Sequence, residues 1–237
     1  MGMTRGRLSG VQAIVFDLDD TLYAQVDFKR SGFRAVASWL AGTSGVDEGA
    51  MYQALSEQLD RLGPSHPAIV DHALRRVPSP LPPVDEIVEK FRTHRPDIAL
   101  YPGVRSMLVA LRRDFPLGLL SDGLATVQRN KIAALGLATL VDHVLLSDEY
   151  GSAKPDPALF ERLEQWFGVP GDRMLYVGDN PHKDFIGARM RGWCTVRVAS
   201  GEHAAAQVPA AQQADFVIAG VGDLPALLAT ARGVLSQ

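Results

Sequence analysis

The sequence has few of the features that mark specialised protein classes. Its 237 residues include one cysteine, Cys194, so no disulfide can form within the chain. Cys194 begins a mostly apolar, β-branched stretch, which favours a buried structural thiol in a reducing compartment over a nucleophile. Aromatic residues make up only 7% and no basic stripe is present, which argues against a nucleic-acid-binding protein.

Strong charge and long apolar runs are also lacking. The formal net charge is −3 and no run of like charge occurs, so nothing indicates a surface that binds a polyanion. No segment approaches the roughly 18 consecutive apolar residues of a membrane helix, and no apolar run of signal-peptide type follows the N-terminal arginines. We therefore expect no nucleic-acid partner, no membrane partner and a cytoplasmic location. Hydrophobic residues, at 46%, are enough for a globular core.

Short apolar runs separated by helical patterns predict an α/β fold. The first run, residues 13–16, ends at Asp17 and is typical of a strand buried on both faces. The later runs lie at residues 116–120, 144–146, 174–177, 194–198 and 216–219, and the helical patterns between them at 104–113, 127–135 and 157–167. We therefore predict a Rossmann-like parallel sheet with helices on both faces.

The chain between about residues 26 and 98 breaks this alternation. It contains no convincing strand, and its helical patterns lie at residues 27–40, 47–62, 69–77 and 84–94. Such a segment after the first strand predicts a small, all-helical inserted domain. We assign residues 1–23 and 99–237 to the core and 24–98 to the insert, with Pro102-Gly103 marking the return to the core.

Polar side chains follow several of the predicted strands. Asp17, Ser121 and Asp179 each stand at or just past the carboxyl end of a buried run. In an open parallel sheet these ends meet at one crevice, which is where ligands bind. Carboxylates are costly to bury unpaired, so several at one edge of a sheet need a cation or a shared proton.

Two of the polar clusters are rich in carboxylates. Asp17-Leu18-Asp19-Asp20-Thr21 combines a carboxylate that can act as a nucleophile with an acid that can protonate a departing alkoxide. Asp179 and Asp184 stand at a strand end and at the start of the next helix, where they can hold a hard cation through oxygen. Taken alone, each cluster also fits turn and helix-capping residues. For Asp20 we expect local hydrogen bonding.

Two further clusters suit an anionic ligand. Ser121-Asp122-Gly123 precedes a predicted helix, where free N–H groups and the helix dipole favour negative charge, although an ordinary N-cap fits as well. Lys154 precedes Pro155-Asp156-Pro157, which holds it in an extended or turn conformation. A lone loop lysine is usually solvated. His182 is not expected to bind metal, because an all-oxygen site suits magnesium better.

Together the four clusters resemble the motifs of the haloacid dehalogenase superfamily in order and spacing. The stretch Phe16-Asp17-Leu18-Asp19-Asp20-Thr21-Leu22 is similar to the first motif, and Ser121, Lys154 and the stretch from Gly178 to Asp184 are similar to the other three. The helical insert resembles the C1-type cap of this superfamily. The second and third motifs, with Gln128 and Lys131, look most like the phosphatase branch of nucleoside 5′-monophosphatases and N-acylneuraminate-9-phosphatases.

The resemblance implies a role for each motif position. The nucleophile is Asp17 and the general acid and base is Asp19. The implied phosphate-binding residues are Ser121, Asp122 and Lys154, the Mg²⁺ ligands are Asp17, Asp19 through its backbone carbonyl and Asp179, and the supporting residues are Thr21, Gly123 and Asp184. The implied function is a magnesium-dependent phosphomonoesterase that forms an aspartyl-phosphate. Its substrate is expected to be a small soluble phosphate ester, such as a sugar phosphate, a nucleotide or a nonulosonate phosphate.

Three alternatives remain beside this function. A 2-haloacid dehalogenase would share Asp17, but that branch typically lacks an Asp at the position of Asp19. A phosphomutase keeps both acids and stays open. A catalytically idle, phosphate-binding regulatory module is less favoured, because all four motif positions hold competent residues. At the base of the insert we expect Tyr23 and Phe28 to pack and Lys29 and Arg30 to lie on a solvated helix face; the oligomeric state is unknown.

Overall fold

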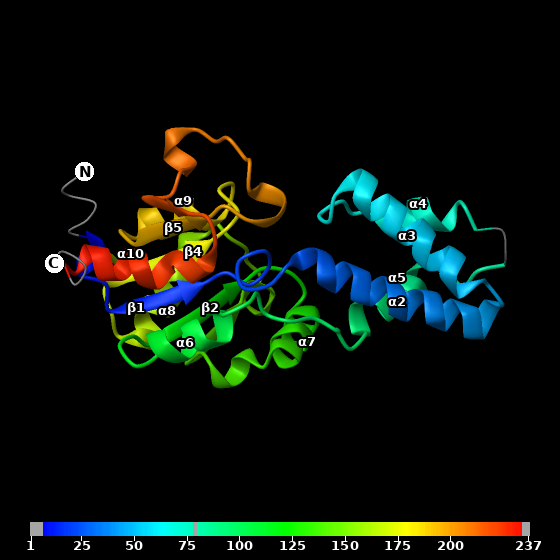
Figure 1. Ribbon diagram of the computed structural model, residues 1–237, viewed down its shortest axis with the longest axis horizontal. Helices are drawn as coiled ribbons and strands as arrows, with labels where there is room; N and C mark the ends of the chain where they lie inside the picture. Colours follow the sequence, from blue (N-terminus) through cyan, green and yellow to red (C-terminus); the bar gives the residue numbers. More distant parts are fainter. Residues whose placement is uncertain (1–6, 78–79, 234–237) are drawn as a thin grey trace.

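A six-stranded parallel sheet is the centre of the protein (Figure 1). The computed structural model describes residues 7–77 and 80–233. The strands are β1 (Ala13–Phe16), β2 (Leu117–Ser121), β3 (His143–Leu146), β4 (Met174–Gly178), β5 (Cys194–Val198) and β6 (Phe216–Ile218). Their order is β3-β2-β1-β4-β5-β6, and Ile14 of β1 pairs with Leu117 of β2 and with Leu175 of β4. The predicted parallel sheet is confirmed, with β1 near its middle.

Helices cover both faces of this sheet. They are α6 (Val104–Leu111), α7 (Ala125–Leu135), α8 (Pro157–Phe167), α9 (Asp184–Met190) and α10 (Leu224–Ala231). Successive side chains of a strand point to opposite faces. Accordingly, Ile14 and Phe16 join a hydrophobic cluster with α6, α7 and α10, whereas Val15 joins one with α8 and α9. The short α/β connections leave the carboxyl ends of β1, β2 and β4 at the same edge, which faces the insert.

Among the residues that the structure describes, four helices stand between β1 and α6, where the helical insert was predicted. They are α2 (Gln25–Ser44), α3 (Glu48–Leu62), α4 (Ile69–Leu74) and α5 (Val84–Thr93), and no strand occurs between β1 and α6 in the described residues. These helices share a hydrophobic cluster of their own, which includes Phe33, Leu40 and Leu55. Helix α2 runs longer than predicted and ends where Gly45 adopts a φ of 68°, a conformation that glycine tolerates best. Helix α4 stops three residues before its predicted end.

The two connections of the insert to the core run side by side. The N–H of Tyr101 donates a hydrogen bond to the carbonyl oxygen of Leu22 at 2.9 Å. On another side, Ser65 in the loop between α3 and α4 donates to the Glu202 carboxylate of the core at 2.5 Å. Figure 1 shows the insert projecting beyond the end of the sheet at which the β1 strand stops.

Within the described ranges, no helix combines the length and the apolar character needed to cross a membrane.

Candidate active site

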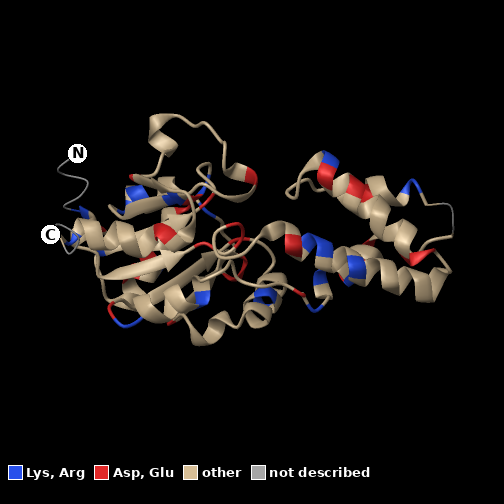
Figure 2. Ribbon diagram, viewed as in Figure 1, with Lys and Arg blue, Asp and Glu red and all other residues tan. Residues whose placement is uncertain are grey.

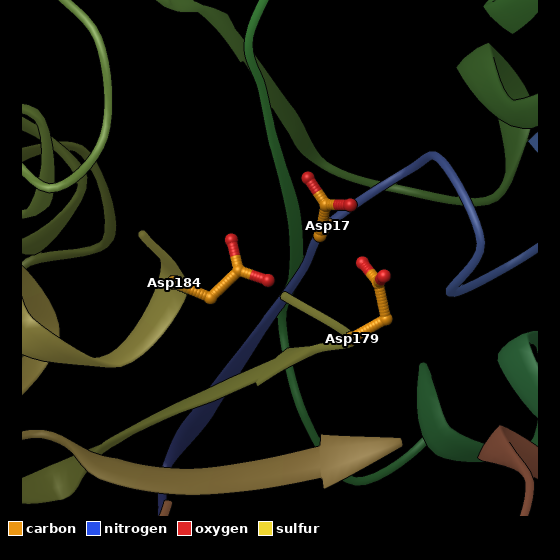
Figure 3. A group of neighbouring side chains, drawn as sticks. All are labelled: Asp17, Asp179 and Asp184. Carbon is orange, nitrogen blue, oxygen red and sulfur yellow. The ribbon is translucent and has the colours of Figure 1, made fainter. Parts of the chain in front are cut away.

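Three buried carboxylates converge at the edge of the sheet (Figure 3). Asp17 follows the last residue of β1, Asp179 follows the last residue of β4, and Asp184 is the first residue of α9. Each offers one carboxylate oxygen, and these oxygens lie within 4.8 Å of one another. The adjacency of β1 and β4 therefore brings together side chains that lie far apart in the sequence.

A single ammonium group joins two of these carboxylates. The Nζ atom of Lys154 donates to Asp17 at 2.5 Å, to Asp184 at 2.8 Å and to the hydroxyl of Tyr176 at 2.9 Å. The Lys154 side chain is fully buried. Burial disfavours the ammonium, but Asp17 and Asp184 outweigh it and hold the pKa of Lys154 well above its usual value. Lys154 is thus a permanent cation of the site rather than a solvated loop residue.

One lysine does not balance three buried carboxylates. Burial raises the pKa of Asp17 to about 6, although Lys154 opposes the shift, and burial together with Asp17 raises the pKa of Asp179 to about 9. The carboxylate of Asp184 accepts hydrogen bonds from the ammonium of Lys154 and from the backbone N–H of Asn180, the latter at 2.8 Å. The donor set is all oxygen, which is what Mg²⁺ prefers. The residues therefore fit a hard divalent cation beside Asp17 and Asp179.

The carboxylate of Asp19 points to a different set of partners. The Nζ atom of Lys131 donates to its two oxygens at 2.7 and 2.9 Å, the side-chain amide of Gln128 donates at 3.1 Å, and the hydroxyl of Tyr23 also donates to it. Burial works against the charge on Asp19, but the ammonium of Lys131 outweighs it and lowers the pKa of Asp19. The two carboxylates of the first motif thus have separate environments, as separate chemical roles require.

The predicted phosphate-binding residues lie along the same edge. The hydroxyl of Ser121, the last residue of β2, accepts a hydrogen bond from Gln128 at 2.5 Å. The Asp122 carboxylate accepts the backbone N–H of Lys154 at 3.1 Å, so its side chain holds the Lys154 loop. Because a carboxylate repels phosphate, Asp122 can serve an anion only through its backbone or through this loop. Gly123 follows with a φ of 104°, which favours glycine.

The remaining sequence predictions around the first motif have mixed outcomes. Thr21 is fully buried, and its hydroxyl has no hydrogen-bond partner within the described residues. The Asp20 carboxylate accepts the N–H of Gln25 at 2.8 Å, which confirms its local role. Arg30 is exposed, as predicted. The prediction for Lys29 was wrong: α2 turns this residue toward the core, where its half-buried side chain lines a cavity.

Some functional contacts were not foreseen from the sequence. Tyr23 packs at the base of the insert as predicted, but its hydroxyl also binds Asp19. Gln128 and Lys131 entered only through the family resemblance. Their spacing of three residues places them on one face of α7, and this was the available signal. Tyr176 is buried in the middle of β4, where the sequence predicted only core packing.

A cavity of about 400 Å³ lies between the core and the insert. Its core side includes Asp19, Asp122 and Lys131, and its insert side includes Phe28 and Lys29. A second cavity of about 250 Å³ shares Asp19 and Asp122 with it and contains Asp17 and Asp179. A ligand at the carboxylates can therefore extend toward the insert. Figure 2 shows acidic chain segments gathered in the loops at this junction.

Comparison with known proteins agrees with this geometry. Residues 11–192 match a family described as haloacid dehalogenase-like hydrolase. The chain is 33% identical to a glyceraldehyde 3-phosphate phosphatase of Methanopyrus kandleri over 81% of this chain and 86% of that protein. It is 30% identical to an N-acylneuraminate-9-phosphatase of Rattus norvegicus over 55% and 52% of the two chains. The putative HAD-hydrolase YfnB of Bacillus subtilis shares the fold, with a TM-score of 0.70 at 15% identity, over 92% of this chain and 98% of that one.

The chain therefore belongs to the haloacid dehalogenase-like hydrolases. Within that family it is a phosphatase, a hydrolase of phosphoric monoesters. This confirms the class of enzyme that the four sequence motifs predicted.

Proposed function

We propose that the protein is a magnesium-dependent phosphomonoesterase that forms an aspartyl-phosphate on Asp17. One observation carries the proposal. The carboxylate of Asp17 is held by Lys154 beside Asp179 in a buried crevice, while Asp19 is held apart from them by Lys131. A nucleophile next to a cation site and a second acid with its own environment are the two groups that phosphoryl transfer through a carboxylate needs.

The residues divide the reaction between them. An oxygen of Asp17 attacks phosphorus, and the bond from phosphorus to the ester oxygen breaks. The ammonium of Lys154 offsets the charge of the phosphoryl oxygens, and the hydroxyl of Ser121 donates a hydrogen bond to them. Asp19 gives a proton to the departing oxygen and later takes one from the water that hydrolyses the acyl phosphate. Since Lys131 keeps Asp19 ionised at rest, we expect the first proton to enter with a monoanionic phosphate ester.

The cation has a definite place in this proposal. Asp17, Asp179 and the backbone carbonyl of Asp19 would hold Mg²⁺, and Asp184 would support Lys154 and the hydration shell of the ion. When bound, Mg²⁺ would offset the carboxylate charge that otherwise repels an anionic phosphate ester, and it would stabilise charge on the transferring phosphoryl group. The raised pKa values of Asp17 and Asp179 support the need for a cation.

The substrate is proposed to be a small, soluble organic phosphate. A cavity of about 400 Å³ suits a short carbon chain or a sugar attached to the phosphoryl group. The names of the relatives, which include phosphatases of glyceraldehyde 3-phosphate and of an N-acylneuraminate 9-phosphate, support the same class. We further propose that residues 24–98 form a cap that contacts the leaving group. The acid Asp19 favours phosphate esters over haloacids, since displacement of halide needs no proton for an alkoxide.

Hydrolysis of a generic aryl phosphate tests the proposal. We expect turnover with Mg²⁺, none after chelation with EDTA, and recovery when Mg²⁺ is returned. Calcium should support little activity, because it prefers more ligands and looser geometry. Undiminished turnover in excess EDTA would exclude the metal role. Transfer of the phosphoryl group within a sugar phosphate, without release of phosphate, would instead show a mutase.

A further inference from the structure

The cavity between core and insert contains a cation that the catalytic carboxylates do not use. Lys29, on the second turn of α2, lines this cavity together with Asp19 and Lys131. Within residues 7–77 and 80–233, the ammonium of Lys29 forms no ion pair and no hydrogen bond. It lies 5.4 Å from the centroid of the Phe91 ring. Figure 2 shows an acidic band at the core end of α2, followed along the helix by basic bands.

Lys131, the other lysine of the cavity, differs from Lys29 because its charge has a partner. The ammonium of Lys131 is paired with Asp19 and lies 4.4 Å from the centroid of the Phe28 ring. The rings of Phe28 and Phe91 meet edge to face, with 5.5 Å between their centroids. Two ammonium groups therefore rest on one pair of aromatic rings. The charge of Lys131 is neutralised by Asp19, and that of Lys29 is not.

Lys29 is held in unfavourable surroundings for a free cation. Burial lowers its pKa and the charge of Lys131 lowers it further, and the more distant carboxylates of Asp19 and Glu202 offset only part of this shift. An ammonium taken partly out of water without a partner costs free energy that an anionic ligand would offset. The remaining charged residues of the insert side, Asp71 and Arg92, are exposed and of opposite sign, so they supply no dedicated partner. The cavity thus offers one unneutralised positive charge to a ligand.

The phosphoryl group of a substrate does not need this charge, because Lys154 serves it at the other end of the site. The anion that meets Lys29 then belongs to another part of the same molecule. A carboxylate and a second phosphate share the required chemistry. A single ammonium beside aromatic rings matches the single charge of a carboxylate. A phosphate dianion is instead bound by several hydrogen-bond donors.

We propose that Lys29 binds a carboxylate of the substrate, so that the preferred esters are short phosphorylated acids. This inference rests on the proposed phosphomonoesterase function and narrows its substrate class. Through Lys29, helix α2 would then select the leaving group of the substrate by its charge. Esters of the same size that lack the acid, such as phosphorylated alcohols and amines, are then poorer ligands.

Equilibrium binding tests the inference without relying on turnover. In an Asp17→Asn background, with Mg²⁺ present, isothermal titration calorimetry would compare phosphoserine with phosphoethanolamine, which lacks only the carboxylate. A second pair, 3-phosphoglycerate and glycerol 3-phosphate, contains no amine. We expect the acid of each pair to bind at least about tenfold more tightly, the value of one charge-assisted hydrogen bond.

Substitutions of Lys29 assign the preference to this residue. Lys29→Met keeps the length of the side chain and should reduce each ratio to about one, whereas Lys29→Arg should retain most of it. Lys90→Met is the matched control, because Lys90 lies on α5 outside the cavity, and the ratios should be unchanged. Circular dichroism would verify the fold of each variant.

The outcomes separate the two proposals. Equal binding of acid and non-acid in the parent, or a preference that survives Lys29→Met, would overturn the role of Lys29. Tighter binding of propane-1,3-diol bisphosphate than of phosphoserine would overturn the assignment of a carboxylate. Neither result affects the phosphomonoesterase function, which is tested separately by the hydrolysis of an aryl phosphate by the wild-type protein with Mg²⁺.

Discussion

At the scale of single residues, the site depends on how the two acids of the first motif are separated. Asp17 and Asp19 are two residues apart, yet their carboxylates have different partners, Lys154 for one and Lys131 for the other. Strand β1 ends at Phe16, so Asp19 lies in the loop that follows, outside the regular alternation that would place residues 17 and 19 on the same side. The sequence motif predicted both acids. It did not predict the contact between Asp19 and Lys131, because nothing in the spacing between residues 19 and 131 indicates it.

The role of Asp19 can be tested by replacing its carboxyl group with an amide, which cannot serve as a general acid or base. Asp19→Asn should reduce kcat for an alkyl phosphate by about 10² to 10⁴, the usual value of general acid–base catalysis. With an aryl phosphate, whose leaving group needs little protonation, the first step should be less affected and phosphoenzyme should accumulate. Rapid-quench kinetics with the two substrates measures the difference. An equal loss for both esters, with no phosphoenzyme, would contradict the role of Asp19 in the second step.

A second prediction at this scale concerns the effect of Gly178→Ala on stability and on the response to Mg²⁺. A Cβ atom there would lie 2.4 Å from an oxygen of Asp184, so Gly178→Ala must displace this carboxylate. We expect a loss of stability of about 1 to 3 kcal/mol and a 10- to 100-fold weaker response to Mg²⁺, the usual effect of losing a supporting group. Gly222→Ala is the control, since its Cβ meets nothing within 4 Å. Activity titrated with Mg²⁺ in both variants measures the effect, and matching curves would show that the position of Asp184 is unimportant.

At the scale of elements, the order of strands does most of the assembly. Asp17, Ser121 and Asp179 come from β1, β2 and β4, which are adjacent in the sheet, and this adjacency brings the three motifs together. The sequence predicted the strands and their parallel arrangement from short apolar runs. Helix ends were less predictable, because α2 ends at a glycine in a left-handed conformation that apolar periodicity alone does not reveal.

The insert was predictable as helices but not in its orientation. Lys29 and Arg30 are neighbours in sequence, yet one lines the cavity and the other is exposed. Which of two polar neighbours faces the core depends on the rotation of α2 about its axis. That rotation is set by packing, for example by Phe28 and Phe33 against the rest of the protein.

Exchange of the insert tests whether it selects the substrate. Replacing the segment between Tyr23 and Tyr101 with the insert of a related phosphatase should change the order of preferred esters, because the insert supplies one side of the cavity. The requirements for Mg²⁺ and for Asp17 should stay, since the core supplies both. The measurement is kcat/KM over a panel of esters, after the fold is verified. A folded chimera with the parent's order of preference would place specificity in the core loops.

At the scale of the whole molecule, the metal-free site opposes folding at high pH. The pKa of Asp179 is about 9 in the folded protein and near 3.8 in the unfolded chain, so the folded state holds the extra proton between these values. The free energy of unfolding of the metal-free protein should therefore fall as the pH rises through this window. Mg²⁺ requires the ionised carboxylates, so its stabilising effect should grow over the same range.

Thermal unfolding at two pH values measures this coupling. With Mg²⁺ fixed at about 100 times the dissociation constant that it has at pH 8.5, we expect a rise in Tm on the order of 5 °C at pH 8.5 and a smaller one at pH 6, where binding is weaker. Asp179→Asn should remove most of the difference between the two conditions. An equal rise at both pH values in the wild-type protein would show that Asp179 does not carry the proton in question.

The most direct test of the catalytic mechanism is to locate the phosphoryl group on the enzyme. A ³²P-labelled ester mixed with the enzyme and Mg²⁺, quenched in acid within one turnover and digested, should yield one labelled peptide that contains Asp17. Asp17→Asn, folded but with its activity reduced by at least about 10³, should yield none. Label on another residue, or rapid turnover by Asp17→Asn, would contradict the assignment of Asp17 as the nucleophile.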